Sequence, residues 1–226
     1  MRRSPLTTLR NGIMAPLYEY GPKLYLGIFI SYGWTLFGLN LLTILLCAPV
    51  ITAPAAICAL NRVLMKITLD GECKVMKEYW GEFKNSFFRV LPFFSIGTAL
   101  SVALGLLIFN LLFISNLGLA GYVILAFCII ACIFVYLVFT YAVILFVTVD
   151  LPVGTNIKNA ILLTLSQPKR DFLIIIMPLA ITVLLALLFP RTIAIFVLLI
   201  PAFTSLMSCC IIKPILEKEI LITEQE

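Results

Sequence analysis

The stretch LNLLTILLCAPVITAPAAICALNRVLMK, Leu39–Lys66, decides the fold. It is an apolar run that is broken once, between Pro49 and Pro54, and that ends soon after Asn61. Proline has no backbone donor and the residue before it avoids the helical region, so a helix that reaches Pro49 ends there. Thr52 and Pro54 suit the first turn of a second helix, Thr52 as its cap and Pro54 as an early helical residue. The stretch therefore predicts a hairpin of two membrane helices.

The composition supports a membrane protein. Of the 226 residues, 62% are hydrophobic and 12% are charged, and the mean hydropathy is +1.14. A soluble domain has about 45–50% apolar and about 25% charged residues. The apolar runs are continuous, whereas the strands of a membrane barrel alternate apolar and polar residues. The predicted fold class is therefore all-α, a polytopic membrane helical bundle.

The apolar runs predict a single membrane domain with about six transmembrane helices. They pair into three hairpins, over about 24–66, 91–149 and 172–212. The second helix, about 52–66, is only about 22 Å long at 1.5 Å per residue, less than the roughly 30 Å of a bilayer core. It either spans a thinned region or is re-entrant.

Amphipathic segments lie between the hairpins, over about 74–90 and 155–167. In the first, Trp80, Phe83 and Phe87 follow a helical period, while charged residues occupy the other side. This pattern is typical of a helix that lies in the membrane interface. The three aromatic residues are a candidate face for lipid or for a partner protein.

The basic residues predict the orientation. With six crossings, every lysine and arginine except Arg191 lies on the side of the two termini. Five crossings, with a re-entrant segment around Pro49–Pro54, would divide the basic residues between both sides. The positive-inside rule therefore favours six crossings, with the N- and C-termini in the cytoplasm.

A few small and polar residues interrupt the predicted spans. Asn40 and Asn110 each need a hydrogen-bond partner in lipid, so we expect them to face the bundle. Gly97, Ser101 and Gly105 recur at every fourth position and form a candidate surface for close helix packing. The neutral polar residues have two interpretations, the lining of a path for a neutral solute or hydrogen bonds between helices; they are Asn40, Asn110, Thr35, Thr43, Thr140 and Ser205.

Residues suited to catalysis or metal binding are scarce. The chain has no histidine, and its eleven acidic residues fall in predicted cytoplasmic or interfacial segments. Cys128 and Cys132 have the spacing of two helical metal ligands, but buried cysteines that act as small hydrophobic residues explain them better. No glycine-rich phosphate-binding motif is present. We therefore expect no enzymatic activity, catalytic residue, metal, cofactor or nucleic-acid partner.

Two segments resemble the YesL family of bacterial integral membrane proteins, whose function is not defined. They are LNLLTILLCAPVITAPAAICAL, Leu39–Leu60, and EYWGEFKNSFFRVLP, Glu78–Pro92. Members of this family are often encoded beside carbohydrate uptake systems of the ABC type. The resemblance therefore implies a link to sugar import.

Two functions follow as expectations. The first is an accessory or regulatory protein of an ABC-type carbohydrate uptake system, with the lipid bilayer and ABC permease subunits as partners. The alternative is a small carrier of a neutral solute that acts on its own. Ion-coupled carriers usually hold ionisable residues at membrane depth, and the predicted spans hold none.

Overall fold

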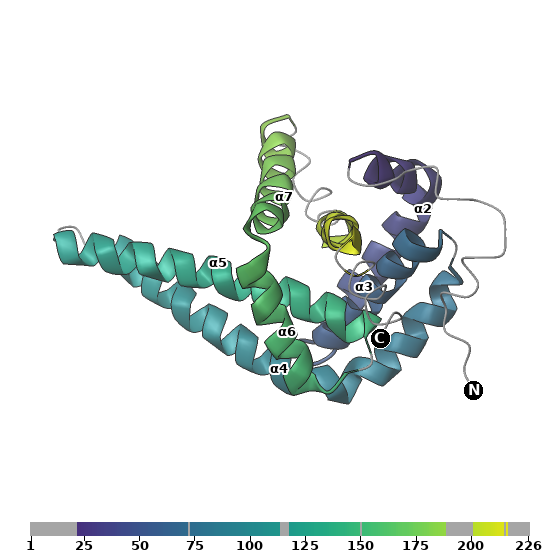
Figure 1. Ribbon diagram of the computed structural model, residues 1–226, viewed down its shortest axis with the longest axis horizontal. Coiled ribbons are helices and arrows are strands. Elements are labelled where there is room, and N and C mark those ends of the chain that lie inside the picture. The colour runs from purple at the N-terminus through teal and green to yellow at the C-terminus, as the bar shows by residue number, and fades with distance from the viewer. Residues whose placement is uncertain are drawn as a thin grey trace.

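The computed structural model describes residues 22–71, 73–113, 118–149, 151–188, 201–214 and 216, and these residues form helices and short connections without a strand. The helices are α2 (Pro22–Cys47), α3 (Ala53–Asp70), α4 (Val75–Leu112), α5 (Leu119–Thr148), α6 (Val153–Ser166) and α7 (Pro168–Leu188). A further helical segment covers 201–214 and is the yellow helix of Figure 1. The all-helical prediction is confirmed for this part of the chain.

Three of the described helices are long and apolar enough to cross a membrane. They are Gly27–Cys47 in α2, Val75–Leu112 in α4 and Leu119–Thr148 in α5. The prediction of a membrane protein with several spans is therefore confirmed. The count of six stays a prediction, and the start of the sixth predicted helix lies outside the described residues.

The predicted break between α2 and α3 is present. The helix α2 ends at Cys47, and the backbone N–H of Thr52 donates to the carbonyl of Pro49 at 3.0 Å to close the turn. Pro54 lies in the first turn of α3, as predicted. Thr52 is the N-cap residue of α3, as predicted. Its hydroxyl makes no capping bond and donates instead to the carbonyls of Leu46 and Pro49 at the end of α2.

The helix α3 is the central element of the fold. It packs against α2, α4 and α5, and a run of small residues, Ala55, Ala56 and Ala59, lets these neighbours approach closely. It continues to Asp70, beyond the predicted end at residue 66, and Gly71 closes it in the left-handed conformation with a φ of 76°. Because nearly all of its surface is covered by protein, α3 serves as the core of the bundle rather than as a lipid-facing span.

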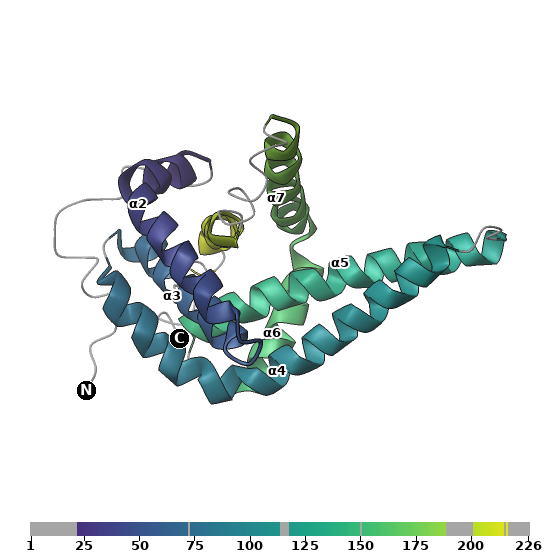
Figure 2. The ribbon, with the colours of Figure 1, turned by 180° about the vertical axis from the view of Figure 1, so that it is seen from behind.

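The structure joins two segments that the sequence separates. The predicted interfacial helix over 74–90 and the start of the predicted hairpin at 91 form one continuous helix, α4. Pro92 lies inside it and removes one backbone hydrogen bond, which is a usual cause of a bend. Figures 1 and 2 show α4 changing direction along its length. The second predicted interfacial segment, over 155–167, forms α6 and packs on α5. That either segment lies in the membrane interface stays a prediction.

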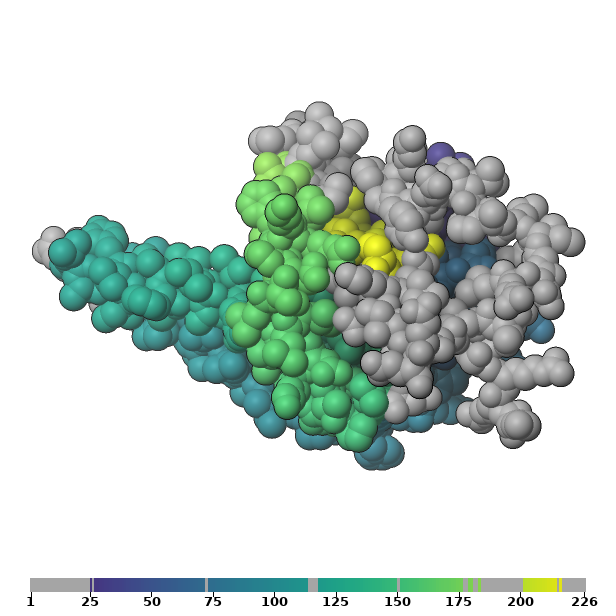
Figure 3. Space-filling view, viewed as in Figure 1, coloured from purple at the N-terminus to yellow at the C-terminus, as the bar shows by residue number. Residues whose placement is uncertain are grey.

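The second half of α4 and the first half of α5 form a long hairpin that projects from the rest of the molecule (Figures 1 and 3). Only 6% of the most apolar window of α4 and 11% of that of α5 are buried within the chain. Large apolar side chains, among them Leu106, Phe109 and Phe127, lie exposed on it. This surface has the composition of a lipid-facing one.

Candidate functional site

Polar side chains on α2 and α3 hold the 201–214 segment in place. Asn40, which is 1% exposed, accepts a hydrogen bond from the backbone N–H of Ala202 at 3.0 Å. The buried ammonium group of Lys213 donates to the carbonyl of Thr68 at 3.0 Å. The expectation that Asn40 faces the bundle is therefore met, and its partner lies 162 residues away in the sequence.

Thr43 is also buried, and it joins α2 to α4. Its hydroxyl donates to the carbonyl of Leu39 at 2.8 Å and lies 3.1 Å from the hydroxyl of Tyr79. Because the hydrogen of Thr43 is already used, the Tyr79 hydroxyl donates to Thr43. Asn40 and Thr43 both make contacts between parts of the chain that are distant in the sequence.

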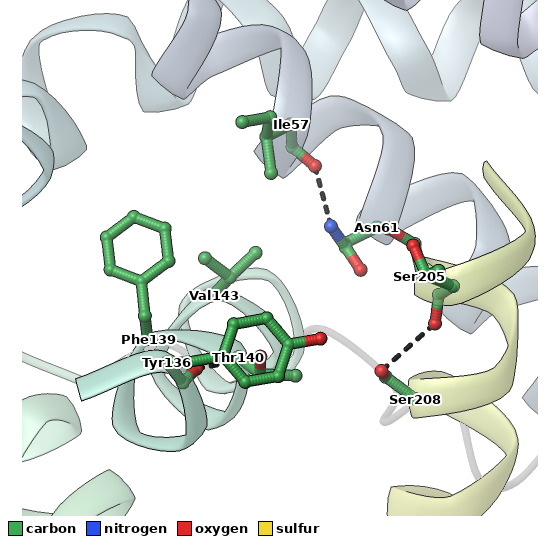
Figure 4. Close-up of a pocket in the computed structure, with 9 residues that line it drawn as sticks. Ile57, Asn61, Tyr136, Phe139, Thr140, Val143, Ser205 and Ser208 are labelled. Carbon is green, nitrogen blue, oxygen red and sulfur yellow. Dashed lines mark hydrogen bonds between the residues drawn. The ribbon is translucent and has the colours of Figure 1, made fainter. Parts of the chain in front are cut away.

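A pocket of about 140 Å³ lies between α3, α5 and the 201–214 segment. Figure 4 shows Asn61 approaching from α3, Phe139 and Val143 from α5, and Ser205 and Ser208 from the 201–214 segment. The complete lining is Ile57, Asn61, Tyr136, Phe139, Thr140, Val143, Thr204, Ser205 and Ser208. None of these residues carries a charge at neutral pH. Of the neutral residues that the sequence indicates as a path lining, this pocket brings together Thr140 and Ser205.

The pocket residues follow helical spacing on each element. On α5, Tyr136, Phe139, Thr140 and Val143 recur at intervals of three or four and share one face. Asn61 lies one turn after Ile57, to whose carbonyl its amide donates at 2.9 Å. The carbonyl of the same amide accepts from the thiol of Cys209 at 3.8 Å, which ties α3 to the 201–214 segment. The sequence analysis missed Asn61 as a pocket residue, although a lone amide near the end of an apolar run was its signal.

The other predicted packing residues lie away from the pocket. Asn110 is exposed on the outer part of α4, and its amide donates to the carbonyl of Leu106 in its own helix at 2.8 Å. The prediction that Asn110 faces the bundle is therefore wrong within the described chain. An amide on a helix surface can donate one hydrogen bond to a carbonyl of its own helix. Exposure of such an amide to lipid therefore costs less than exposure of an amide without any hydrogen bond.

The predicted small-residue surface on α4 is used at one of its three positions. At Gly97, a Cβ atom would lie 3.1 Å from the ring of Phe139 on α5, so the two helices approach closely there. Ser101 is exposed, and a Cβ atom at Gly105 would meet nothing within 4 Å. Phe139 also stacks on Phe93 with ring centroids 5.4 Å apart. The close contact is therefore between α4 and α5 of the same chain.

The candidate aromatic face of α4 is partly covered by the rest of the chain and partly exposed. Phe83 is half-buried and packs on the core, and Phe87 is also half-buried. Trp80 is 40% exposed, and the neighbouring Phe88 is 82% exposed. On the exposed side of this part of α4, Lys77, Trp80, Lys84 and Phe88 recur at intervals of three or four residues.

Charged side chains gather at the other end of the molecule from the hairpin tip. Arg62 donates to the carbonyl of Val147 near the end of α5, and Arg89 donates to the carbonyl of Leu151 at 2.6 Å. Lys66 forms an ion pair with Glu78 at 2.6 Å. Cations near the carboxyl end of a helix are favourable to its dipole. These contacts join α3, α4 and the end of α5.

Asp171, at the start of α7, is the buried carboxylate of this region. It accepts a hydrogen bond from the hydroxyl of Tyr141 at 2.8 Å. Burial raises the pKa of Asp171 above its usual value, and the bond from Tyr141 opposes that rise in pKa. The seven cysteines are free thiols, and the described residues contain no group of three His, Cys, Asp or Glu side chains that could hold a metal ion.

Residues 36–111 match a family model described as "Protein of unknown function, DUF624". The match covers about a third of the chain and includes the second part of α2, all of α3 and nearly all of α4. No curated protein and no solved structure matches the chain.

Proposed function

We propose that this protein is a non-enzymatic, multi-pass protein of a bacterial cell membrane that assists or regulates an ABC-type carbohydrate uptake system. The resemblance to the YesL family supports the link to uptake systems. Both segments that resemble that family, Leu39–Leu60 and Glu78–Pro92, lie inside the range matched by the family model. The six-crossing topology with cytoplasmic termini, inferred from the basic residues, is part of this proposal.

The observation that carries the proposal is the exposed α4–α5 hairpin. Most of the apolar surface of this hairpin is not buried within the chain. Such a surface suits lipid and the membrane helices of a partner. The exposed side chains Leu106, Phe109 and Phe113 lie close to its tip and would contact a permease helix there.

The pocket supports a second candidate function, a carrier of a neutral solute. Its lining combines hydroxyl and amide groups with apolar side chains. It includes no carboxylate, lysine or arginine, the side chains that usually couple transport to ions.

The test of the first function is isolation of the tagged protein from its native membrane in mild detergent, followed by mass spectrometry. We expect stoichiometric recovery of ABC permease subunits. Substitution of Leu106 and Phe109 by alanine keeps the hairpin apolar but changes its shape, so this variant should recover less permease. An unrelated tagged multi-pass protein serves as the control.

Recovery of the protein alone would contradict the accessory function. Solute flux by the purified protein in liposomes would then favour the carrier function.

A further inference from the structure

We infer that the pocket between α3, α5 and the 201–214 segment binds a neutral molecule about the size of one six-membered ring, which donates hydrogen bonds through hydroxyl or amide groups. This inference is independent of the proposed function, because such a site serves a regulator as well as a carrier. It follows from the size of the pocket, from the hydrogen bonds that its lining already makes, and from its depth in a membrane span.

The size of the pocket suits a small ligand. The pocket has a volume of about 140 Å³. An apolar cavity of about 150 Å³ in another protein is known to take up benzene. A single six-membered ring therefore fills the pocket.

The hydrogen bonds within the lining decide which groups the ligand must carry. Thr140 donates to the carbonyl of Tyr136 at 2.9 Å, and Ser208 donates to that of Thr204 at 3.0 Å. A hydroxyl has one hydrogen and two acceptor lone pairs, so a hydroxyl that donates to its own helix still offers its oxygen to a ligand. Thr140 and Ser208 thus present acceptor oxygens to the pocket, and a ligand that bonds to both of them carries O–H or N–H groups.

Part of the lining is apolar. Ile57, Phe139 and Val143 provide carbon surface, and Figure 4 shows them apart from Ser205 and Ser208. The ligand therefore presents carbon to these three side chains and its donors to Thr140 and Ser208. Hydrophobic walls with a few polar groups that fix orientation are the usual construction of small-molecule sites.

The depth of the pocket selects a neutral ligand over a cation. Its α5 residues, from Tyr136 to Val143, lie within the span Leu119–Thr148. A charge at membrane depth is costly unless an opposite charge compensates it. No carboxylate lines the pocket, so a cation that used the same oxygen atoms would remain uncompensated.

The test uses two probes of equal ring size, cyclohexane-1,4-diol, which donates, and 1,4-dioxane, which only accepts. The full-length protein is placed in nanodiscs of phosphatidylcholine, and saturation-transfer NMR follows each probe in a titration. We expect the diol to bind, and dioxane to bind at least tenfold more weakly. A double variant, Thr140→Val with Ser208→Ala, should weaken diol binding at least tenfold at nearly unchanged volume.

Thr148→Val is the matched control, because Thr148 also donates to its own helix on α5, at 2.7 Å to Ile144, but lies outside the pocket. It should bind the diol like the unmodified protein. If the double variant has a lower unfolding midpoint, Ser205→Leu replaces it, since a leucine at this partly exposed position fills the pocket and should abolish binding.

Three results would overturn the inference. Equal binding of diol and dioxane would show a pocket without selectivity for donors. Unchanged diol binding in the folded pocket variants would place the diol elsewhere, in the lipid or on another surface. Failure of both probes to bind would show that water or lipid chains fill the pocket.

Discussion

At the scale of single residues, the asparagines within apolar helices have different roles according to their partners. Asn40 meets a backbone N–H from a distant segment, whereas Asn110 meets only a carbonyl of its own helix. In the sequence, the two look alike, since each is one asparagine within an apolar run. The cost of an unpaired amide in lipid predicts that a partner exists, but it does not say whether the partner is local or distant.

The contact between Asn40 and Ala202 should contribute measurably to stability. Replacement of Asn40 by leucine removes the acceptor and leaves a buried N–H without a partner, so we expect a loss of about 0.5–2 kcal/mol in the free energy of unfolding. Asn110→Leu is the matched control and should change little, because Asn110 bonds only within α4. Unfolding in detergent measures the stability of both variants. An unchanged unfolding midpoint for Asn40→Leu would show that the bond between Asn40 and Ala202 does not stabilise the fold.

The buried carboxylate of Asp171 should make stability depend on pH. Because its pKa is higher in the folded protein than in the unfolded chain, the folded state binds the proton more tightly. Its contribution to stability is therefore fully present at acidic pH below the usual carboxyl pKa, and is lost as pH rises through the raised value. Asp171→Asn keeps an oxygen that accepts the hydrogen bond from Tyr141. Because asparagine does not titrate, this variant does not lose stability as pH rises.

We expect the stability of Asp171→Asn relative to the unmodified protein to increase as pH rises from 4 towards 7. Unfolding midpoints across this range measure the difference. Asp171→Ala, which also loses the bond from Tyr141, should be less stable than Asp171→Asn at every pH. If the difference in unfolding midpoint between Asp171→Asn and the unmodified protein stays constant with pH, the pKa of Asp171 is not raised.

At the scale of elements, the ends and lengths of apolar runs were predictable, and the continuity and neighbours of helices were less so. Long uninterrupted runs fix α2 and α5 within a few residues, and Pro49 and Pro54 fix the turn between α2 and α3. The change from an amphipathic to an apolar pattern suggests two helices where α4 is one, because proline bends a helix without always ending it. The burial of α3 depends on its three neighbours, and the sequence alone does not show which helices pack against it.

Gly97 should control the packing of α4 on α5. Gly97→Leu places a side chain against Phe139, and we expect a loss of about 1–3 kcal/mol in the free energy of unfolding. Gly97→Ala should change less, since the helix propensity of alanine, worth about 1 kcal/mol over glycine, offsets the shift of the ring. Gly105→Leu, with open space around it, is the control; equal effects of leucine at both positions would refute the close contact.

The two sides of the first half of α4 should respond differently to charge. Phe83 packs on the core, so Phe83→Glu should destabilise the fold by about 1–3 kcal/mol. Phe88 is exposed, so Phe88→Glu should leave the unfolding midpoint nearly unchanged and weaken contact with lipid. Unfolding midpoints, with aqueous labelling of neighbouring residues, separate these effects, and a reversed order of stabilities would contradict the placement of this helix.

At the scale of the whole molecule, composition alone predicted an all-helical membrane protein, and the distribution of basic residues gave an orientation. The pocket was beyond such reasoning. It joins Asn61 to residues that lie some 148 positions later, as its contact with Cys209 illustrates, and spacing along one chain carries no information on such pairs. The sequence did indicate Thr140 and Ser205, because neutral polar groups in apolar runs are few.

We propose that the α4–α5 hairpin crosses the membrane, with its tip outside and the first half of α4 on the cytoplasmic side. Labelling with a membrane-impermeant maleimide tests it most directly, in a variant whose seven native cysteines have been replaced. Single cysteines are placed at Gly118 in the tip, at Phe109 in the apolar part of α4, and at Lys84. We predict that Gly118→Cys is labelled in intact cells, that Lys84→Cys is labelled only after permeabilisation, and that Phe109→Cys is labelled in neither case. Labelling of Phe109→Cys from water, or of Gly118→Cys only after permeabilisation, would contradict the account.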